Sequence, residues 1–328
     1  MNSEKKEGIP MASYVEKITQ NGADYRRVNI YVERPSGYGR RRKSRPTPAA
    51  QQRLNKRNAE TRLSDVIHNN FTPSDFAVRL DYNNFIAKNE RNPTLKEAHA
   101  KIAYYLTKLR RVYASFGAEL KYCYSTEVGA RSGKVHHHLI ISGSPDKEVR
   151  GYLRDAIEEQ WRHGYGNVQA LKFDANGVKG LAHYFVKDDL TSKRWVPSHG
   201  LVRPAEDNGL IDRWRGGIRA KDAKYIDAHP EDATFLSERY PGWYTLEVRT
   251  TGQAQRDDAT PYDVPSVTDR ERGIVDGLVL PDYGGVFIEL WQFREDAEFL
   301  RRPEYKWLRD KIKMAKMQIK QKSNGGKL

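Results

Sequence analysis

The sequence predicts an α+β fold in which an antiparallel sheet carries helices on one face. One observation is the order of elements between residues 71 and 190, which reads strand, helix, hairpin, helix, strand, helix. A second is that the strands alternate apolar and polar residues, as half-buried strands do. A third is that each helix has an apolar stripe on one side only, so the helices can share one face and leave the other open.

The N-terminal elements are a hairpin, a basic segment and a helix. The hairpin is expected over 13–33, with its turn at Asn21-Gly22, a dipeptide that tolerates positive φ. The segment 34–48 is basic and punctuated by Gly and Pro, which is typical of a solvated linker and equally of an arm that binds phosphates. Apolar residues at helical spacing then predict a helix over 51–68.

A strand and the clearest helix open the middle of the chain. Residues 76–82 alternate between apolar and polar side chains. The helix that follows can be capped by Thr94, with Glu97 three residues later to complete a capping box. Gly117 is expected to close it, since glycine readily adopts the conformation that ends a helix.

Two further strands and a helix come next. The strands are expected at 119–127 and 135–142. Ser144 can cap the next helix, with Pro145 at its first position, which is the favoured order. Gly164 is expected to end that helix.

The rest of the chain has fewer clear signals. A strand at 168–173 and a helix at 181–190 complete the middle region. Strands at 243–249 and 285–291 suggest an accessory module that pairs with the N-terminal hairpin. A helix with an apolar stripe and many basic residues is expected within 305–328, either docked on the body or in contact with a polyanion.

These elements divide the chain into an N-terminal hairpin and arm (1–50), a main domain (51–204) and an accessory region with a basic helical tail (205–328). Lys and Arg number 57 against 43 Asp and Glu, giving a net charge of +14. This excess favours a polyanion such as nucleic acid as partner, although it also fits an ordinary basic protein.

Composition excludes several other classes. Cys123 is the only cysteine, so an intrachain disulfide and a cysteine zinc cluster are excluded and a reducing cytoplasm is expected. No apolar run approaches the roughly 20 residues that span a bilayer, so no membrane association is expected. The N-terminal residues lack the apolar core of a signal peptide.

Three consecutive histidines, His136-His137-His138, stand in one of the predicted strands. Side chains of a strand alternate between its two faces, so His136 and His138 share one face and His137 points to the other, with its apolar neighbours. Two neutral imidazoles side by side can bind one divalent cation. His137 is assigned to packing, where its polar edge needs a partner.

A carboxylate from the preceding strand can join the two histidines. Glu127 ends that strand near the hairpin turn, on the face opposite Tyr124 and Thr126. Two imidazoles and one carboxylate leave coordination positions open for a phosphate oxygen. The alternatives are a structural role, a chance triplet or an adventitious nickel-binding surface, and the cross-strand register of Glu127 is only inferred.

Tyr184 and Lys187 form the second candidate group, because residues three apart emerge on one face of a helix. A phenol can attack a phosphodiester if a metal polarises the phosphate and a cation stabilises the developing charge. Lys187 can supply that cation or lower the pKa of the phenol. In isolation this pair has no meaning, and Tyr184 would be assigned to packing; its position after the histidine strand raises it.

Three segments together resemble the motifs of single-tyrosine HUH endonucleases, and more closely the rolling-circle replication-initiation (Rep) proteins of bacterial plasmids, prophages and single-stranded DNA phages. The resemblance covers about residues 50–204. The stretch 193–198 with Pro204 is similar to the one after the tyrosine helix in bacterial members, and 76–82 to the first-motif strand. The segments are Ser125-Thr126-Glu127, Gly133 to Ile141, and Tyr184-Phe185-Val186-Lys187.

This resemblance implies a ferredoxin/RRM-like core and a site-specific nicking and joining reaction. His136 and His138 would bind Mg²⁺ or Mn²⁺, and Tyr184 would remain linked to the 5′ phosphate of the nick. Lys187 would act near the phosphate, and the free 3′ hydroxyl would prime synthesis and later rejoin the strand. The chain departs from the family in having His137 where an apolar residue is usual, and in its single motif tyrosine, which leaves termination open.

The implied substrate is single-stranded DNA or an extruded hairpin loop, held by basic and aromatic side chains. Residues 129–134 do not match an ATPase phosphate loop, so no nucleotide cofactor is expected, and a host helicase and DNA polymerase would assist. A transposase or conjugative relaxase of the same chemistry, and a DNA-binding protein without catalysis, are the alternatives. The expected DNA contacts are Arg131, Lys134, Lys193, Arg194 and Trp195, the last of which could equally be a core anchor.

Overall fold

The computed structural model confirms the α+β class and forms two compact units. The central unit is the continuous segment Lys56–Asp207, and the flanking unit combines Met1–Asn55 with Asn208–Leu328. The residues that the structure describes are 13–33, 48–83, 92–129, 132–186, 195–202, 212–215, 218–250, 274–275, 278–279 and 288–325.

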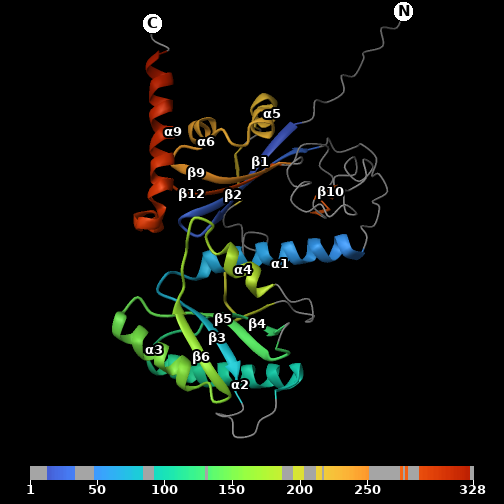
Figure 1. Cartoon of the computed structure of the whole chain (residues 1–328), viewed down its shortest axis with the longest axis vertical. Coiled ribbons are helices and arrows are strands. Elements are labelled where there is room, and N and C mark those ends of the chain that lie inside the picture. The colour runs from blue at the N-terminus through green and yellow to red at the C-terminus, as the bar shows by residue number, and fades with distance from the viewer. Residues whose placement is uncertain are drawn as a thin grey trace, which may run out of the picture. The chain divides into compact units, whose positions relative to one another are not determined.

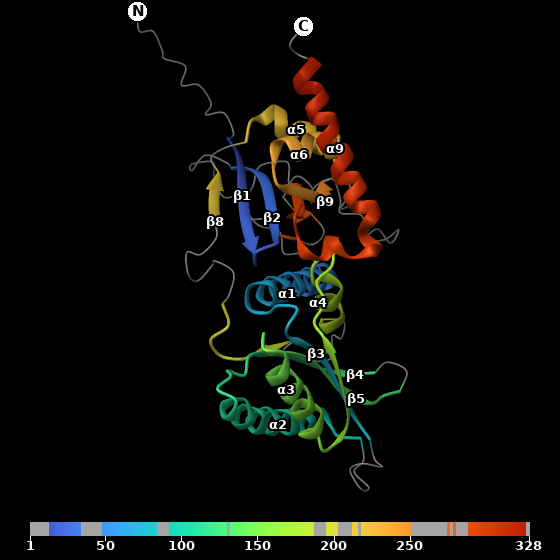
Figure 2. The same cartoon turned by 90° about the vertical axis from the view of Figure 1, so that its left-hand side faces the viewer.

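The central unit is built on a five-stranded sheet with the order β6-β3-β5-β4-β7. All of its neighbouring strands are antiparallel, as the sequence predicts. The fifth strand, β7, was not predicted and pairs with β4 at the edge. The strands are β3 (Phe76–Tyr82), β4 (Tyr122–Val128), β5 (Val135–Ile141), β6 (Gly164–Ala170) and β7 (Val196–Pro197) (Figures 1 and 2).

Two helices cover one face of this sheet, α2 (Leu95–Ser115) and α3 (Lys147–Glu159) (Figure 1). The capping box of Thr94 and Glu97 at the start of α2 is confirmed, as is the positive φ of Gly117 after its end. The helices are held by a core whose largest members lose all their exposure: Leu80, Ile102, Leu109, Tyr113, Leu139, Ile141, Leu153 and Ile157.

The second face of the sheet is not open along its whole length, and that expectation is wrong for one end. There α1 (Pro48–Asn70) and α4 (Lys179–Phe185) pack on the sheet in a separate apolar cluster. Cys123 and Ile140 supply the sheet side of this cluster, and both are fully buried. Because those two residues are apolar on an otherwise polar face, they require a cover at that end.

The predicted bounds of α3 and β6 are wrong by a few residues. Asp146, not Ser144, caps α3: its Oδ1 accepts from the backbone N–H groups of Glu148 and Val149 at 2.9 Å. Gly164 ends no helix but begins β6, four residues before the predicted strand. A Cβ at Gly164 would lie 1.9 Å from the carbonyl oxygen of Asp81, so only glycine allows this close approach of β6 to β3.

The flanking unit has its own five-stranded sheet, with the order β8-β1-β2-β12-β9. The N-terminal hairpin is confirmed, and β12 pairs with β2, as the predicted accessory module requires. A separate hairpin joins β10 (Ile274–Val275) to β11 (Leu278–Val279). The sheet strands are β1 (Ser13–Asn21), β2 (Tyr25–Glu33), β8 (Asp212–Arg215), β9 (Trp243–Thr250) and β12 (Ile288–Arg294).

Two short helices, α5 (Ala220–Ala228) and α6 (Ala233–Arg239), were not predicted. They pack through the buried side chains of Ile226 and Leu236 on the strands of this unit. Each spans only two turns or so, which gives an apolar stripe too few positions to be recognised.

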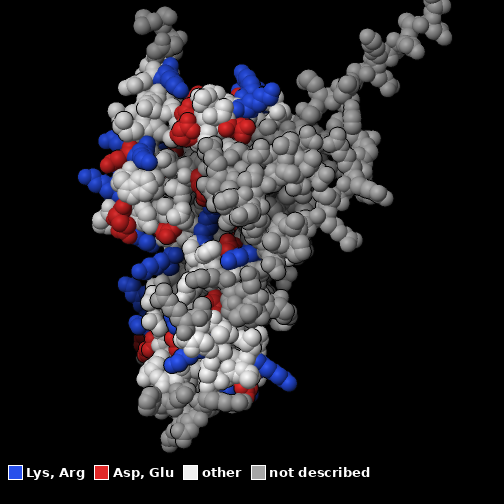
Figure 3. Space-filling model, turned by 45° about the vertical axis from the view of Figure 1, so that its right-hand side comes forward, with Lys and Arg blue, Asp and Glu red and all other residues white. Residues whose placement is uncertain are grey.

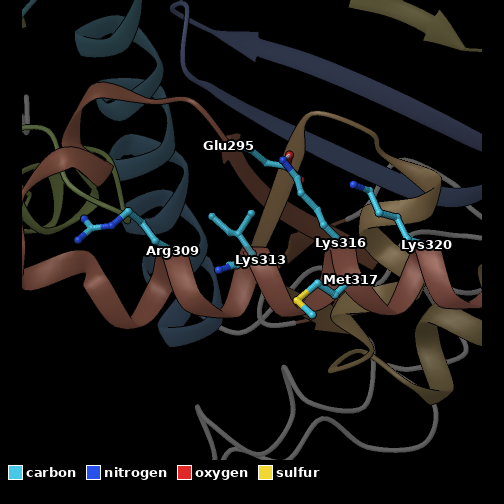
Figure 4. Close-up of a pocket in the computed structure, with 7 residues that line it drawn as sticks. Glu295, Arg309, Lys313, Lys316, Met317 and Lys320 are labelled. Atoms are coloured by element: carbon cyan, nitrogen blue, oxygen red, sulfur yellow. Dashed lines mark ion pairs between the residues drawn. The ribbon is translucent and has the colours of Figure 1, made fainter.

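The basic tail forms the helix α9 (Lys306–Gly325), preceded by the 3-10 turns η1 (Glu298–Arg301) and η2 (Pro303–Tyr305). It docks through its apolar stripe, since Leu308, Ile312 and Ala315 are buried. Figure 4 shows the basic side chains beside this stripe, where Lys316 pairs with Glu295. None of the helices in the described ranges is long and apolar enough to cross a membrane.

Candidate active site

The alternation of the three histidines on β5 is confirmed. His137 points into the core between sheet and helices and has no exposed surface. Tyr82 Oη lies 2.9 Å from its Nε2, and Thr126 Oγ1 lies 2.9 Å from its Nδ1. Both ring nitrogens therefore have a partner, and the side chain is held in one orientation.

His136 and His138 lie on the other face together with Glu127. The register pairs Glu127 with His136 and Ser125 with His138, as the strand parity predicts. Glu127 Oε2 lies 3.4 Å from His136 Nε2 and 3.6 Å from His138 Nε2. One ligand atom of each of the three residues lies within 4.8 Å of the others, so this trio can hold a metal ion.

The polar atoms of the trio are those of a metal site rather than of a packed core. Glu127 Oε1 and His138 Nε2 are buried, yet neither has a hydrogen-bond partner among the described residues. An unpaired carboxylate in a buried position is costly unless a cation or hydrogen bond compensates it. A divalent cation would satisfy both atoms at once.

Burial lowers the pKa of His138 to about 3, with smaller contributions from the charges of His136 and Arg79. The ring is therefore neutral at physiological pH, which is the form that binds a metal.

Tyr184 lies against this trio. Its ring packs on His138 with ring centroids 4.6 Å apart and nearly perpendicular planes, at 83°. Phe185, the next residue of α4, is buried in the apolar cluster and anchors the helix on the sheet. Since the phenol is 41% exposed, it borders the buried trio while remaining open to solvent.

The remaining predicted site residues are less defined by the structure. Lys134 is exposed in the hairpin turn. Trp195 is half-buried and packs as a core anchor against the apolar cluster of α1 and α4, with its Nε1 donating to the carbonyl of Ala59 at 3.3 Å. Lys187, Arg131, Lys193 and Arg194 lie outside the described residues.

Arg79 of β3 is a neighbour of the trio that the sequence did not single out. It pairs across the strands with His138 and so shares its face. Asp81 holds it, with Oδ1 accepting from Nη2 at 2.9 Å and from Nε at 3.1 Å. The alternation of 76–82 already separated Arg79 from the apolar residues of that strand, but the neighbouring strand was not identifiable from that pattern.

The excess of basic residues is not gathered into one patch on the face that Figure 3 shows. There, Lys and Arg side chains of the described residues lie in several groups, with acidic side chains between them. Charge therefore marks this protein less sharply than the geometry around His138 does.

The pKa of His137 gives a prediction about folding. Burial, and then the charges of nearby histidines, lower it to about 3, while in the unfolded chain it titrates at the ordinary value of 6.5. The unfolded state thus binds the proton first, and the stability that neutral His137 contributes is present above pH 6.5 and is lost as the pH falls toward 3. Between pH 7 and pH 5 we expect a loss of about 2 kcal/mol.

Urea unfolding of the wild type and of His137→Leu at both pH values measures this contribution. The loss of stability between pH 7 and pH 5 should be smaller in the variant by about that amount. Equal losses in the two proteins would show that His137 is protonated in the folded state.

Comparison with protein families supports a replication-associated protein. The model of the replication-associated protein family ORF2 matches residues 77–189, about a third of the chain. The matched segment includes Glu127, His136, His138 and Tyr184. No curated protein and no solved structure matches the chain.

Proposed function

We propose that this protein is a replication initiator that nicks single-stranded DNA through Tyr184 and later rejoins the strand. The observation that carries the proposal is the contact of the Tyr184 ring with His138, one of the three residues of the buried trio. A nucleophile beside a metal-binding group is the arrangement that covalent phosphoryl transfer needs. The match to a replication-associated family supports the same assignment.

Glu127, His136 and His138 would hold Mg²⁺ or Mn²⁺, which when bound polarises the scissile phosphate and stabilises negative charge on it. The phenol oxygen of Tyr184 forms a bond to phosphorus, loses its proton to solvent, and the bond from phosphorus to the 3′ oxygen breaks. The 5′ phosphate stays on Tyr184, and the other product is a free 3′ hydroxyl. Attack by a 3′ hydroxyl on the phosphotyrosine reverses these steps and joins the strand.

Other residues are assigned supporting roles in this proposal. Lys187, three positions after Tyr184, stabilises charge near the phosphate, and Lys134 in the hairpin turn contacts the DNA backbone. Arg131, Lys193 and Arg194 are proposed as further DNA contacts. Host helicase and DNA polymerase would extend the 3′ end by rolling-circle synthesis in a bacterial cytoplasm.

Two alternatives are less well supported. A transposase or conjugative relaxase would use the same chemistry, but the matching family is described as replication-associated. A DNA-binding protein without catalysis would use the histidine strand for packing, yet buried Glu127 Oε1 and His138 Nε2 lack the hydrogen bonds that packing would provide.

The proposal is tested with end-labelled single-stranded DNA pools that contain candidate origins, in the presence of Mn²⁺. With a 3′ label, the radioactivity should enter a covalent protein adduct on a denaturing gel. With a 5′ label, it should appear in a shorter free fragment that a DNA polymerase can extend. Label in the adduct from the 5′ end instead would reverse the proposed polarity, and binding without cleavage of any origin would favour the non-catalytic alternative.

A further inference from the structure

The face that carries the trio continues across β3 to β6. Cross-strand register places its side chains in two rows, since directly paired residues point to the same side. Neighbouring strands lie about 4.8 Å apart, so β6 is about 10 Å from β5. The first row is Ser125, His138, Arg79 and Asn167, and the second is Glu127, His136, Asp81 and Tyr165.

Burial decreases along these rows from the trio outward. His136 and His138 are buried, whereas the side chains of Arg79 and Asp81 are 48% and 39% exposed. Tyr165 is 59% exposed, and Asn167 is exposed as well. The apolar cluster of α1 and α4 lies at the other end of this face, around Cys123 and Ile140. The rows therefore form a solvent-exposed strip that begins at the candidate site.

Arg79 is held as an anion-binding group. Two of its donors bond to Asp81 Oδ1, which fixes the guanidinium, and an Arg side chain has five N–H donors in all. The remaining donors are available beside His138, where the register places them. A fixed guanidinium is well suited to a phosphate oxygen because little side-chain freedom is lost on binding.

Tyr165 has no role in the core to explain it. On β6 the inward side chain is Val168, and Tyr165 points to the opposite face from the helices α2 and α3. The close approach at Gly164 fixes the start of β6 against Asp81, so the ring is presented from a rigid strand. An exposed aromatic ring on a sheet face beside a cation is the arrangement on which bases of single strands stack.

We propose that Arg79 and Tyr165 bind the single-stranded substrate next to the trio, with Arg79 on a backbone phosphate and Tyr165 stacked on a base farther along the strand. The ligand class is single-stranded nucleic acid that crosses the sheet from β5 to β6. The identity of the phosphate beside Arg79 as a neighbour of the scissile one rests on the function proposed above, whereas the binding itself does not.

The test is equilibrium binding of a fluorescent single-stranded oligonucleotide to the full chain carrying Tyr184→Phe, without divalent metal and at several salt concentrations. Arg79→Ala should weaken binding by about 10-fold and reduce the slope of log K against log salt by about 0.7, the value for one phosphate contact. Tyr165→Ala should weaken binding by about 10-fold with the slope unchanged. Arg79→Lys should restore the slope, and Tyr165→Phe the affinity.

Matched controls come from α3, on the other side of the sheet. Arg154 and Tyr152 are exposed there, and replacing either with Ala should leave both affinity and slope unchanged. Shortening the oligonucleotide by one nucleotide at a time from each end then locates the stacked base. The difference between wild-type Tyr165 and Ala should disappear at a single step, on one end only.

Three outcomes would overturn the proposal. These are equal affinity of Arg79→Ala and the parent, a salt slope that changes with Tyr165 as much as with Arg79, and a Tyr165 effect that no truncation removes. All of these readings are made without cleavage. If Tyr184 proves not to be the nucleophile but these binding changes appear, the proposed chemistry fails and this strip stands; the opposite pair of results separates them the other way.

Discussion

Tyr184→Phe is expected to abolish the covalent protein–DNA adduct while leaving the chain folded. The ring that packs on His138 is kept, so the contact with the trio and the anchoring of α4 remain. Only the oxygen that would bond to phosphorus is removed. Loss of a nucleophile lowers turnover by about 10⁴-fold or more, so cleavage of an origin oligonucleotide should fall to the background of a denaturing gel.

Other tyrosines provide the controls for this substitution. Tyr104 and Tyr152 are both more exposed than Tyr184, at 61% and 52%, and both stand on helices of the opposite face. Tyr104→Phe and Tyr152→Phe should form the adduct at the wild-type rate. An adduct that persists in Tyr184→Phe would place the nucleophile elsewhere, and peptide mapping of the labelled adduct would then identify it.

Glu127→Gln is expected to separate metal binding from folding. The wild type should gain thermal stability from Mn²⁺, by about 2.7 kcal/mol at a hundred times the dissociation constant. The variant should lose that gain, and cleavage should fall by at least about 100-fold. Without metal its melting temperature should equal or exceed that of the wild type, because Glu127 Oε1 is a buried carboxylate oxygen without a hydrogen-bond partner.

Asp81→Asn is the matched control, since Asp81 lies opposite His136 on the same face but outside the trio. Its response to Mn²⁺ should match that of the wild type in differential scanning fluorimetry. A lower melting temperature of metal-free Glu127→Gln would assign Glu127 a structural role instead. An unchanged response of that variant to Mn²⁺ would exclude Glu127 as a ligand.

The site could be predicted from the sequence because strand alternation is strictly periodic. With residues 135–142 in a strand, the split of His137 from His136 and His138 follows, and the core partners of His137 confirm it. Glu127 depended on cross-strand register, which the short turn between β4 and β5 restricts to few choices.

The errors occurred where local signals compete or where distant segments meet. Ser144 and Asp146 are both good helix caps, and the helix begins after the one whose carboxylate reaches two backbone N–H groups. In β6 only Val168 points inward between small and polar residues, so no alternation marks its start. Neither the cover provided by α1 nor the position of β3 between β5 and β6 could be predicted, since both depend on long-range pairing.

The place of β12 in the sheet of the flanking unit has a consequence for how the chain folds during synthesis. β12 ends at Arg294 yet lies between β2 and β9, so until it leaves the ribosome the N-terminal hairpin keeps an unpaired edge at β2. The central unit is continuous and complete at Asp207. Because domains fold as they emerge, the segment with the trio and Tyr184 is expected to fold first, while the residues made before it wait for the last strand.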